Sequence, residues 1–225
     1  MKLSNETLTI LKNFSSINAG ILFKQGKTLS TVSSTKTVLA QCTLQEEFPQ
    51  EFAIHDLTNF LSVLSLSKDT PELDFDDQHI IIKALGGRSK IKYRFADKKM
   101  IITPPDKAVV MPSEDVSFTL NESDYDWITR TANVLNSPHV AIEGKNGKLR
   151  ISSFDAKDDA ANINSVDIDD TDKAFKSVFK TENLKMIPGS YDVTVSSKGI
   201  AHFKNKNVAI EYWIAIEKDA SNFEG

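Results

Sequence analysis

Hydrophobic side chains recur at helical spacing near the start of the chain and again past its middle. This pattern predicts a helix over residues 4–16, where Ser4 can cap the first turn, and a similar helix over residues 121–135. The apolar positions lie three or four residues apart on one face: Leu8, Leu11 and Phe14 in the first helix, and Tyr125, Ile128 and Leu135 in the second. The opposite faces are polar, so both helices should cover a core and face water.

The same pattern predicts one further helix in each half, over residues 56–66 and residues 172–185. The apolar residues are Leu57, Phe60, Leu61 and Leu64 in the former, and Phe175, Val178 and Phe179 in the latter. Along the latter, Lys173, Lys176 and Lys180 follow one another at steps of three or four residues, which would form one positive stripe. Such a stripe is either an ordinary solvated face or a surface for an anionic partner.

Alternating or continuous apolar runs predict strands after each helix. The glycine-containing segments 20–29 and 140–149 read as hairpins, and strands follow at 73–75, 80–82, 90–95, 191–197 and 207–216. The order helix, hairpin, helix, strands therefore occurs twice. We predict an α+β fold made of one duplicated module, each copy having two helices packed on antiparallel sheets. The modules span residues 1–110 and 116–225.

A proline-containing segment over residues 96–115 links the two modules. Its prolines, Pro104, Pro105 and Pro112, exclude regular structure, yet the segment also contains Ile101, Ile102, Val109, Val110 and Met111. Two interpretations remain open. The apolar residues either dock on the sheets of their own chain or form an exposed groove for a partner's peptide.

Charge is distributed unevenly along this chain of 225 residues with a net charge of −4. Residues 88–99 are strongly basic, whereas residues 155–172 contain seven aspartates and one lysine. The single cysteine, Cys42, excludes an intrachain disulfide and reads as a core residue. Residues 1–6 resemble no signal peptide and no segment approaches the length of a membrane span, so we expect the protein to stay in the compartment where it is made.

The sequence contains no complete motif for catalysis, nucleotide binding or metal binding. Gly26-Lys27-Thr28 lacks the first glycine of a phosphate-binding loop, which should stand at position 21. The aspartate runs 74–77 and 167–172 lack the glycine and glutamate of a calcium loop, and the four histidines are isolated. We therefore expect no enzyme, no cofactor and no metal.

Several segments resemble the DNA sliding clamps of T-even-like bacteriophages. The resemblance is specific in the first module, at Met1-Lys2-Leu3-Ser4, Leu11-Lys12-Asn13-Phe14, Asp56-Leu57 and Phe60-Leu61, and continues at Lys185-Met186 and Pro188-Gly189. It implies a ring of three subunits joined head to tail around duplex DNA, with helices inside and sheets outside. It also implies a tether for the replicative DNA polymerase, an ATP-dependent clamp loader and late-transcription factors as partners, and the cytoplasm of an infected bacterium as the location.

Together, the residues and the resemblance suggest three sets of functional positions. Those expected to face DNA are Lys12, Arg130, Lys176 and Lys180, with Lys68 and Lys185 as weaker candidates. Those expected at the subunit interface are Lys90, Lys92 and Arg94 on one edge strand, and Asp167 and Asp169 on another. Val109, Val110 and Met111 are expected to form a groove for partner peptides.

Two other classes of protein remain as alternatives. One is a single-stranded nucleic-acid binder that forms no ring, which would display exposed aromatic residues among basic ones; Tyr93 and Phe95 beside Arg94 are the hint of it. The other is a phage scaffold protein that does not contact DNA.

Overall fold

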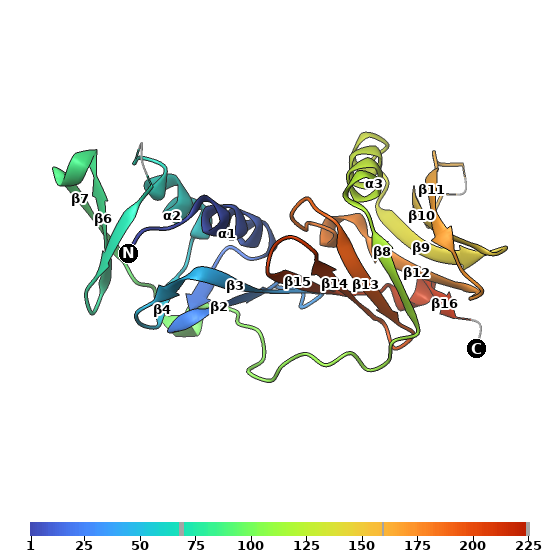
Figure 1. The fold of residues 1–225 in the computed structure, drawn as a ribbon, viewed down its shortest axis with the longest axis horizontal. Coiled ribbons are helices and arrows are strands. Elements are labelled where there is room, and N and C mark those ends of the chain that lie inside the picture. Colours follow the sequence, from blue (N-terminus) through green and yellow to red (C-terminus); the bar gives the residue numbers. More distant parts are fainter. Residues whose placement is uncertain (68–69, 159, 224–225) are drawn as a thin grey trace. The chain divides into compact units, whose positions relative to one another are not determined.

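The computed structural model describes residues 1–67, 70–158 and 160–223, and the chain forms two compact units, Met1–Asp106 and Lys107–Gly225. The boundary between them lies inside the proline-containing segment 96–115. Each unit combines helices with antiparallel sheets, which confirms the α+β class and the duplication (Figure 1).

Unit 1 begins with a helix that packs beside a second, shorter helix. Its elements are α1 (Asn5–Ile17), β1 (Ile21–Phe23), β2 (Gly26–Val32), β3 (Val38–Phe48), β4 (Phe52–Ile54), α2 (Leu57–Leu64), β5 (Glu72–Phe75), β6 (His79–Ala84), η1 (Leu85–Gly87), β7 (Ser89–Arg94) and η2 (Lys98–Met100). Strand β1 pairs with β4 and β2 pairs with β3, all antiparallel, while β5, β6 and β7 form a sheet in that order. The predicted helices 4–16 and 56–66 are thus confirmed.

The core of unit 1 is aromatic where the sheets meet. The rings of Phe23 and Phe52 stack with centroids 4.5 Å apart, and Phe48 and Phe95 pack against this pair. Helix α1 buries Leu11 and Phe14, as its apolar spacing predicts, and also Ile10, whereas Leu8 of the predicted face is only half-buried. Cys42 is also buried, and burial raises the pKa of its thiol to about 12, so it is a protonated core residue at neutral pH.

Unit 2 also has a helix followed by a hairpin and further strands. Its elements are β8 (Val116–Leu120), α3 (Glu122–Val134), β9 (His139–Lys145), β10 (Lys148–Phe154), β11 (Asn164–Asp170), β12 (Phe175–Lys180), η3 (Thr181–Asn183), β13 (Tyr191–Ser196), β14 (Ile200–Asn205), β15 (Ile210–Ala215), η4 (Lys218–Ala220) and β16 (Asn222–Phe223). One sheet has the order β11-β10-β9-β12-β16, and β15, β14, β13 and β8 lie side by side in that order.

The helix predicted over residues 172–185 does not exist, so unit 2 has one α-helix in its described part where two were expected. Residues 175–180 form β12, which pairs antiparallel with β9, and only the single turn η3 follows. The apolar spacing misled the prediction because Phe175 and Phe179, four residues apart, share a face in a strand as well as in a helix. The long β9 supplies a pairing partner along the whole of β12, and tertiary pairing overrides the local pattern.

Backbone hydrogen bonds nevertheless place η3 at the position that α2 occupies in unit 1. In unit 1, the strand after the first helix (β1) pairs with the strand before α2 (β4); in unit 2, β9 and β12 pair in the same way. The first residue of α2, Leu57, donates its N–H to the oxygen of Ala19, 2.7 Å away and two residues before β1. The first residue of η3, Thr181, donates to the oxygen of Pro138, 2.9 Å away and directly before β9.

A carboxylate in β3 anchors the N-terminus of α1. Ser4 caps the helix by accepting from the Thr7 N–H at 3.2 Å, and Glu46 accepts from the Ser4 N–H and from the Thr7 hydroxyl, the latter at 2.5 Å. Burial favours a higher pKa for Glu46, but the hydrogen bonds from Thr7 and Ser4 outweigh it and hold this pKa below its usual value. An ionised Glu46 therefore stabilises the folded unit.

We expect Glu46→Gln to lower the free energy of unfolding at pH 7 by about 1–2 kcal/mol, because charge-assisted hydrogen bonds are replaced by weaker ones. A depressed folded-state pKa contributes stability above the unfolded pKa, which is about 4.3, and that stability is lost as pH falls through the lower folded value. The difference between variant and wild type should therefore shrink below about pH 4 in urea titrations. The neighbouring exposed Glu47→Gln is the matched control. Equal stability of the two variants would contradict this role of Glu46.

Candidate nucleic-acid and subunit interfaces

The outer sides of α1 and α2 are rich in hydroxyl groups and poor in charge. A groove of ≈ 970 Å³ runs between the two helices, and hydroxyl-bearing residues line it, among them Ser15, Thr58, Ser62 and Ser65. Lys12 is exposed and is the one charged residue among the described residues that line this groove. The sequence prediction thus placed Lys12 correctly on the polar side of α1.

Hydroxyl groups on these helices donate their hydrogens to the backbone of their own helix. Thr9 donates to the Asn5 oxygen, Ser62 to Thr58, Thr129 to Tyr125 and Thr131 to Trp127, all at 2.8–2.9 Å. A hydroxyl bound in this way presents lone pairs to solvent and has no hydrogen left for an external acceptor. Such helix faces hold water and offer an anion few direct donors.

Helix α3 presents one exposed cation, Arg130, beside acidic residues. The Arg130 Nε donates to the Asp126 oxygen at 3.2 Å, which orients the guanidinium along the helix surface. Glu122 and Asp124 lie in the first turn, where negative charge stabilises a helix N-terminus. Positive charge on α3 is therefore sparse, as on α1.

Three of the other predicted cations belong to no α-helix. Lys176 and Lys180 share the sheet face opposite α3, because their cross-strand partners Glu143 and His139 belong to that opposite face. Lys180 stands at the end of β12, however, and also lines a cavity whose wall includes Thr129 and Asn133 of α3. The face that α3 covers is identified by Asn164 of β11, whose side chain donates to the Thr131 hydroxyl at 2.9 Å. Lys185 is exposed on the irregular segment after η3, and Lys68 lies outside the described residues.

The basic segment predicted for the subunit interface is an edge strand. In the order β5-β6-β7, strand β7 has a neighbour on one side only within its sheet. Its exposed side chains are Lys90, Lys92 and Arg94, whereas Ile91 and Tyr93 are half-buried on the side of α2. The Tyr93 hydroxyl donates to Asn59 Oδ1 at 3.1 Å, and its ring lies 5.1 Å from that of Phe60.

The acidic segment is also an edge strand, and its charges are partly engaged. Strand β11 closes one side of its sheet, with Asp167 and Asp169 exposed. Asp167 accepts a hydrogen bond from Arg150 on β10 at 2.6 Å, and this bond holds the pKa of Asp167 below its usual value. Asp169 forms no ion pair with the described residues. The two predicted aspartates are therefore not equivalent: Asp169 is the one whose charge is available to another molecule.

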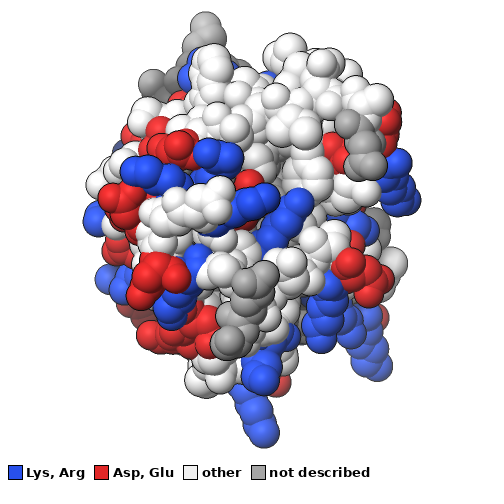
Figure 2. Space-filling model, turned by 90° about the vertical axis from the view of Figure 1, so that its right-hand side faces the viewer, with Lys and Arg blue, Asp and Glu red and all other residues white. Residues whose placement is uncertain are grey.

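Exposed apolar side chains gather where α3 meets β11, which the sequence analysis did not anticipate. Trp127 is 51% exposed and Val134 is 79% exposed, and they lie one turn before and one turn after Thr131, the residue that contacts β11. Ile163, directly before β11, is 66% exposed. Figure 2 views unit 2 from this end; its upper part, on the side of α3, is largely uncharged, and charges of both signs mix below.

The segment predicted to receive partner peptides has no regular structure. Val110 is 81% exposed, and Val109 and Met111 are half-buried. Ile101 at its start is buried, so this apolar residue of the linker docks on its own chain. The three later residues remain a predicted docking segment.

The described residues contain no group of three or more His, Cys, Asp or Glu side chains placed to hold a metal ion. None of the described helices has the length and hydropathy needed to cross a membrane.

Two family models match this chain, each over about one unit. The model described as "DNA polymerase processivity factor" matches residues 4–103, and "gp45 sliding clamp, C terminal" matches residues 117–218. Among curated proteins, the sliding clamp of Escherichia phage RB69 is 32% identical over 99% of both chains. The sliding clamp of Enterobacteria phage T4 is 30% identical over the same shares, and that of Vibrio phage KVP40 is 30% identical over 96% of this chain and 99% of its own.

Solved structures share the fold at much lower identity. The proliferating cell nuclear antigen (PCNA) of Thermococcus kodakaraensis superposes with a TM-score of 0.71 at 13% identity, covering 96% of this chain and 98% of that one. The A. fulgidus protein of the same name, solved with the C-terminal region of FEN-1, gives 0.69 at 15% identity and covers 99% and 98%. The H. pylori beta clamp gives 0.68 at 15% identity, with this chain covering 64% of it.

Proposed function

The chain belongs to the sliding-clamp family of DNA polymerase processivity factors, and we propose that three copies close head to tail into a ring around double-stranded DNA. Membership of this family makes it a non-catalytic protein that holds a phage polymerase on its template. The observation that carries the ring is the complementarity of two edge strands, β7 in unit 1 and β11 in unit 2.

The two edges match on both of their faces. On the exposed face, β7 offers Lys90, Lys92 and Arg94, while β11 offers Asp169 and the partly engaged Asp167. On the helix side, β7 has the half-buried Ile91 and Tyr93, and β11 has Val166 and Ile168. An exposed edge readily pairs with a strand of another chain, and opposite charges direct which edges meet.

Head-to-tail pairing of two different edges leaves one of each free on every dimer, so the assembly grows until it closes. The exposed Trp127, Val134 and Ile163 lie beside β11 and would be covered by the next copy. Covering them removes apolar surface from water, which favours closure at about 25 cal/mol per Å².

We expect Lys92→Glu with Arg94→Glu to convert the trimer into monomers at micromolar concentration, because like charges would then face each other across the pairing. Adding Asp169→Lys should restore the trimer in sedimentation velocity, since Asp169 has no ion-pair partner among the described residues. Lys198→Glu with Lys204→Glu, an equal charge change on exposed residues around β14, is the control. An unchanged mass in the first double variant would refute the proposed pairing.

DNA is proposed to pass along the polar sides of α1, α2 and α3. Lys12 and Arg130 are the cations that face outward on these helices, and Lys185 lies beside α3. Because the helix hydroxyls are bound to their own backbone, attraction comes from a few screened charges acting through water. Attraction to phosphates is independent of sequence and allows sliding.

Reversing both helix cations, Lys12→Glu with Arg130→Glu, should reduce clamp loading and processive synthesis while leaving the trimer intact. The loss should be similar on every DNA sequence and should be largest at low salt, because salt screens both the attraction in the wild type and the repulsion in the variant. Lys198→Glu with Lys204→Glu again provides the matched control in primer-extension assays. Normal processivity of the first variant at low salt would show that these helices do not line the channel.

Partner proteins are proposed to dock short apolar peptides at Val109, Val110 and Met111. The polymerase is the first such partner, and an ATP-dependent loader and late-transcription factors are further candidates; all would act in the cytoplasm of the infected host. These three apolar residues lie between Pro105 and Pro112, and Val110 is exposed. Such a segment can bind an extended apolar peptide.

We expect Val110→Ser with Met111→Ser to weaken binding of a polymerase tail peptide at least about tenfold, since two apolar contacts of about 1 kcal/mol each are lost. Isothermal titration measures the affinity, and the trimer mass should not change. Undiminished peptide affinity would place the docking site elsewhere.

A single-stranded nucleic-acid binder is the less supported reading. Its stacking platform would need Tyr93 and Phe95 exposed, but both rings pack inward, against Phe60 and Phe52 at 5.1 and 5.2 Å.

A further inference from the structure

The missing second helix of unit 2 leaves a groove beside α3. In unit 1, α2 packs against α1; at the equivalent place in unit 2, only the single turn η3 and an irregular segment follow β12. A cavity of ≈ 830 Å³ opens there, and Thr129 and Asn133 on one flank of α3 form part of its wall. Each module therefore has a groove beside its first helix, and the two differ in what forms the other wall: α2 in unit 1, and η3 with the segment after it in unit 2.

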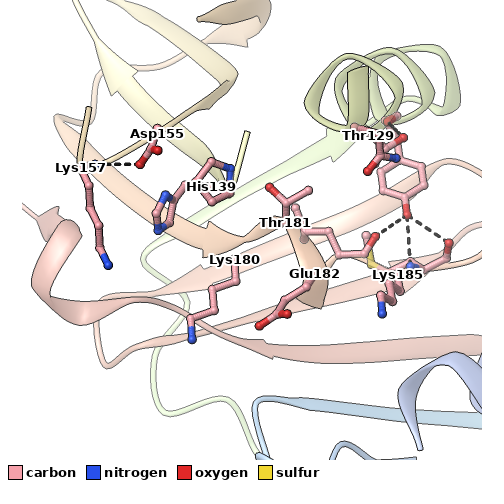
Figure 3. Close-up of a pocket in the computed structure, with 13 residues that line it drawn as sticks. Thr129, His139, Asp155, Lys157, Lys180, Thr181, Glu182 and Lys185 are labelled. Carbon is pink, nitrogen blue, oxygen red and sulfur yellow. Dashed lines mark hydrogen bonds between the residues drawn. The ribbon is translucent and has the colours of Figure 1, made fainter. Parts of the chain in front are cut away.

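Basic side chains reach this groove from three separate segments. Lys180 ends β12, Lys157 belongs to the loop after β10, and Lys185 follows η3; His139 at the start of β9 adds an imidazole. Figure 3 shows Lys157, His139 and Lys180 on one side of the groove and Lys185 on the other, with Glu182 between them. No described carboxylate pairs with the ammonium groups of Lys157 or Lys180.

The backbone beneath each lysine is held in place. Tyr125 of α3 is buried, and its hydroxyl lies 2.9 and 3.0 Å from the oxygens of Leu184 and Met186, the buried residues on either side of Lys185. Thr181, next to Lys180, bonds the oxygens of Pro138 and Ser137 through its N–H and hydroxyl at 2.9 and 2.7 Å.

Lys157 donates its N–H to Asp155 Oδ1 at 2.9 Å. The cations are thus presented by ordered segments and need little reorganisation to bind an anion.

Two carboxylates also line the groove, and they do not cancel its charge. Three lysines against Asp155 and Glu182 leave a net charge of +1 with His139 neutral, in a chain whose net charge is −4. Asp155 is engaged by the loop that it caps, and Glu182 is exposed between the lysines. The residues that line the groove therefore carry a net positive charge next to the polar side of α3.

We propose that this groove binds phosphodiester groups of the DNA backbone, taking over in unit 2 the role that a second helix would have. The inference rests on the proposed passage of DNA along α3 and adds Lys157, Lys180 and His139 to the contacts. Lysine ammonium groups around an open groove suit the phosphodiester group of a sliding DNA strand. Each ammonium is a mobile point charge, whereas an arginine guanidinium would bind two oxygens in a fixed geometry. The contact is independent of base sequence.

The test compares Lys157→Gln with Lys180→Gln against a matched loss of two charges, Lys198→Gln with Lys204→Gln. Affinity of the assembled protein for a fluorescent linear duplex is measured by anisotropy over a salt series. The slope of log affinity against log salt should fall by about 0.9 for each phosphate contact that the first variant loses, and should stay unchanged in the control. Glu182→Gln should change affinity in the opposite direction and tighten binding, an outcome that misfolding cannot produce.

Equal slopes for the first variant and wild type, with Glu182→Gln also neutral, would overturn the groove while leaving the ring in place. An equal loss in both double variants would attribute the effect to net charge alone and overturn it as well. Absence of duplex binding by the wild-type protein at low salt would count against DNA encirclement itself, and with it against the groove.

Discussion

Two strand edges that lack a partner, one in each unit, are the constraint on which the proposed ring depends. A sheet edge leaves backbone N–H and C=O groups in water, where they can pair with a strand of another chain. Folded proteins usually protect such edges, so an unprotected edge indicates a partner. Here β7 and β11 carry opposite charge on one face and apolar residues on the other. Each edge therefore repels a second copy of itself and attracts the other edge, which favours head-to-tail pairing over a symmetric dimer. Such pairing closes into a ring when the rotation between successive copies allows it.

The helices provide a second interaction, with DNA, that is weaker than the proposed pairing of the strand edges. Their hydroxyl groups are bound to their own backbone, and exposed cations on them are few. A protein that must stay on DNA without stopping needs topological closure for retention and only weak attraction for alignment. In the proposed ring, the strand edges would provide the interface between copies and the helices a hydrated surface toward DNA.

The sequence predicted the structure correctly where the apolar residues followed a single period, either that of a helix or that of a strand. The helices of unit 1 and the alternation from Lys90 to Phe95 were predictable because each segment's burial follows a single periodicity. It failed over residues 172–185, where Phe175 and Phe179 fit both periods and the deciding factor was pairing with β9. The predicted lysine stripe depended on that helix and was therefore wrong as well. The Lys176 ammonium lies 4.4 Å from the ring centroid of Phe154, on the sheet face away from α3.

Other parts of the site could not have been predicted from spacing. Trp127 reads as one apolar residue on a polar helix face, and only the packing of α3 on β11 reveals that it joins Ile163 and Val134 at an edge. Lys157 and His139 come from separate segments that the sheet brings to one groove.

The mass of the wild-type protein in solution, measured by native mass spectrometry at micromolar concentration, tests the central claim most directly. We expect a closed particle of three 25.0-kDa chains, whereas a stable monomer or a symmetric dimer would contradict the proposed ring.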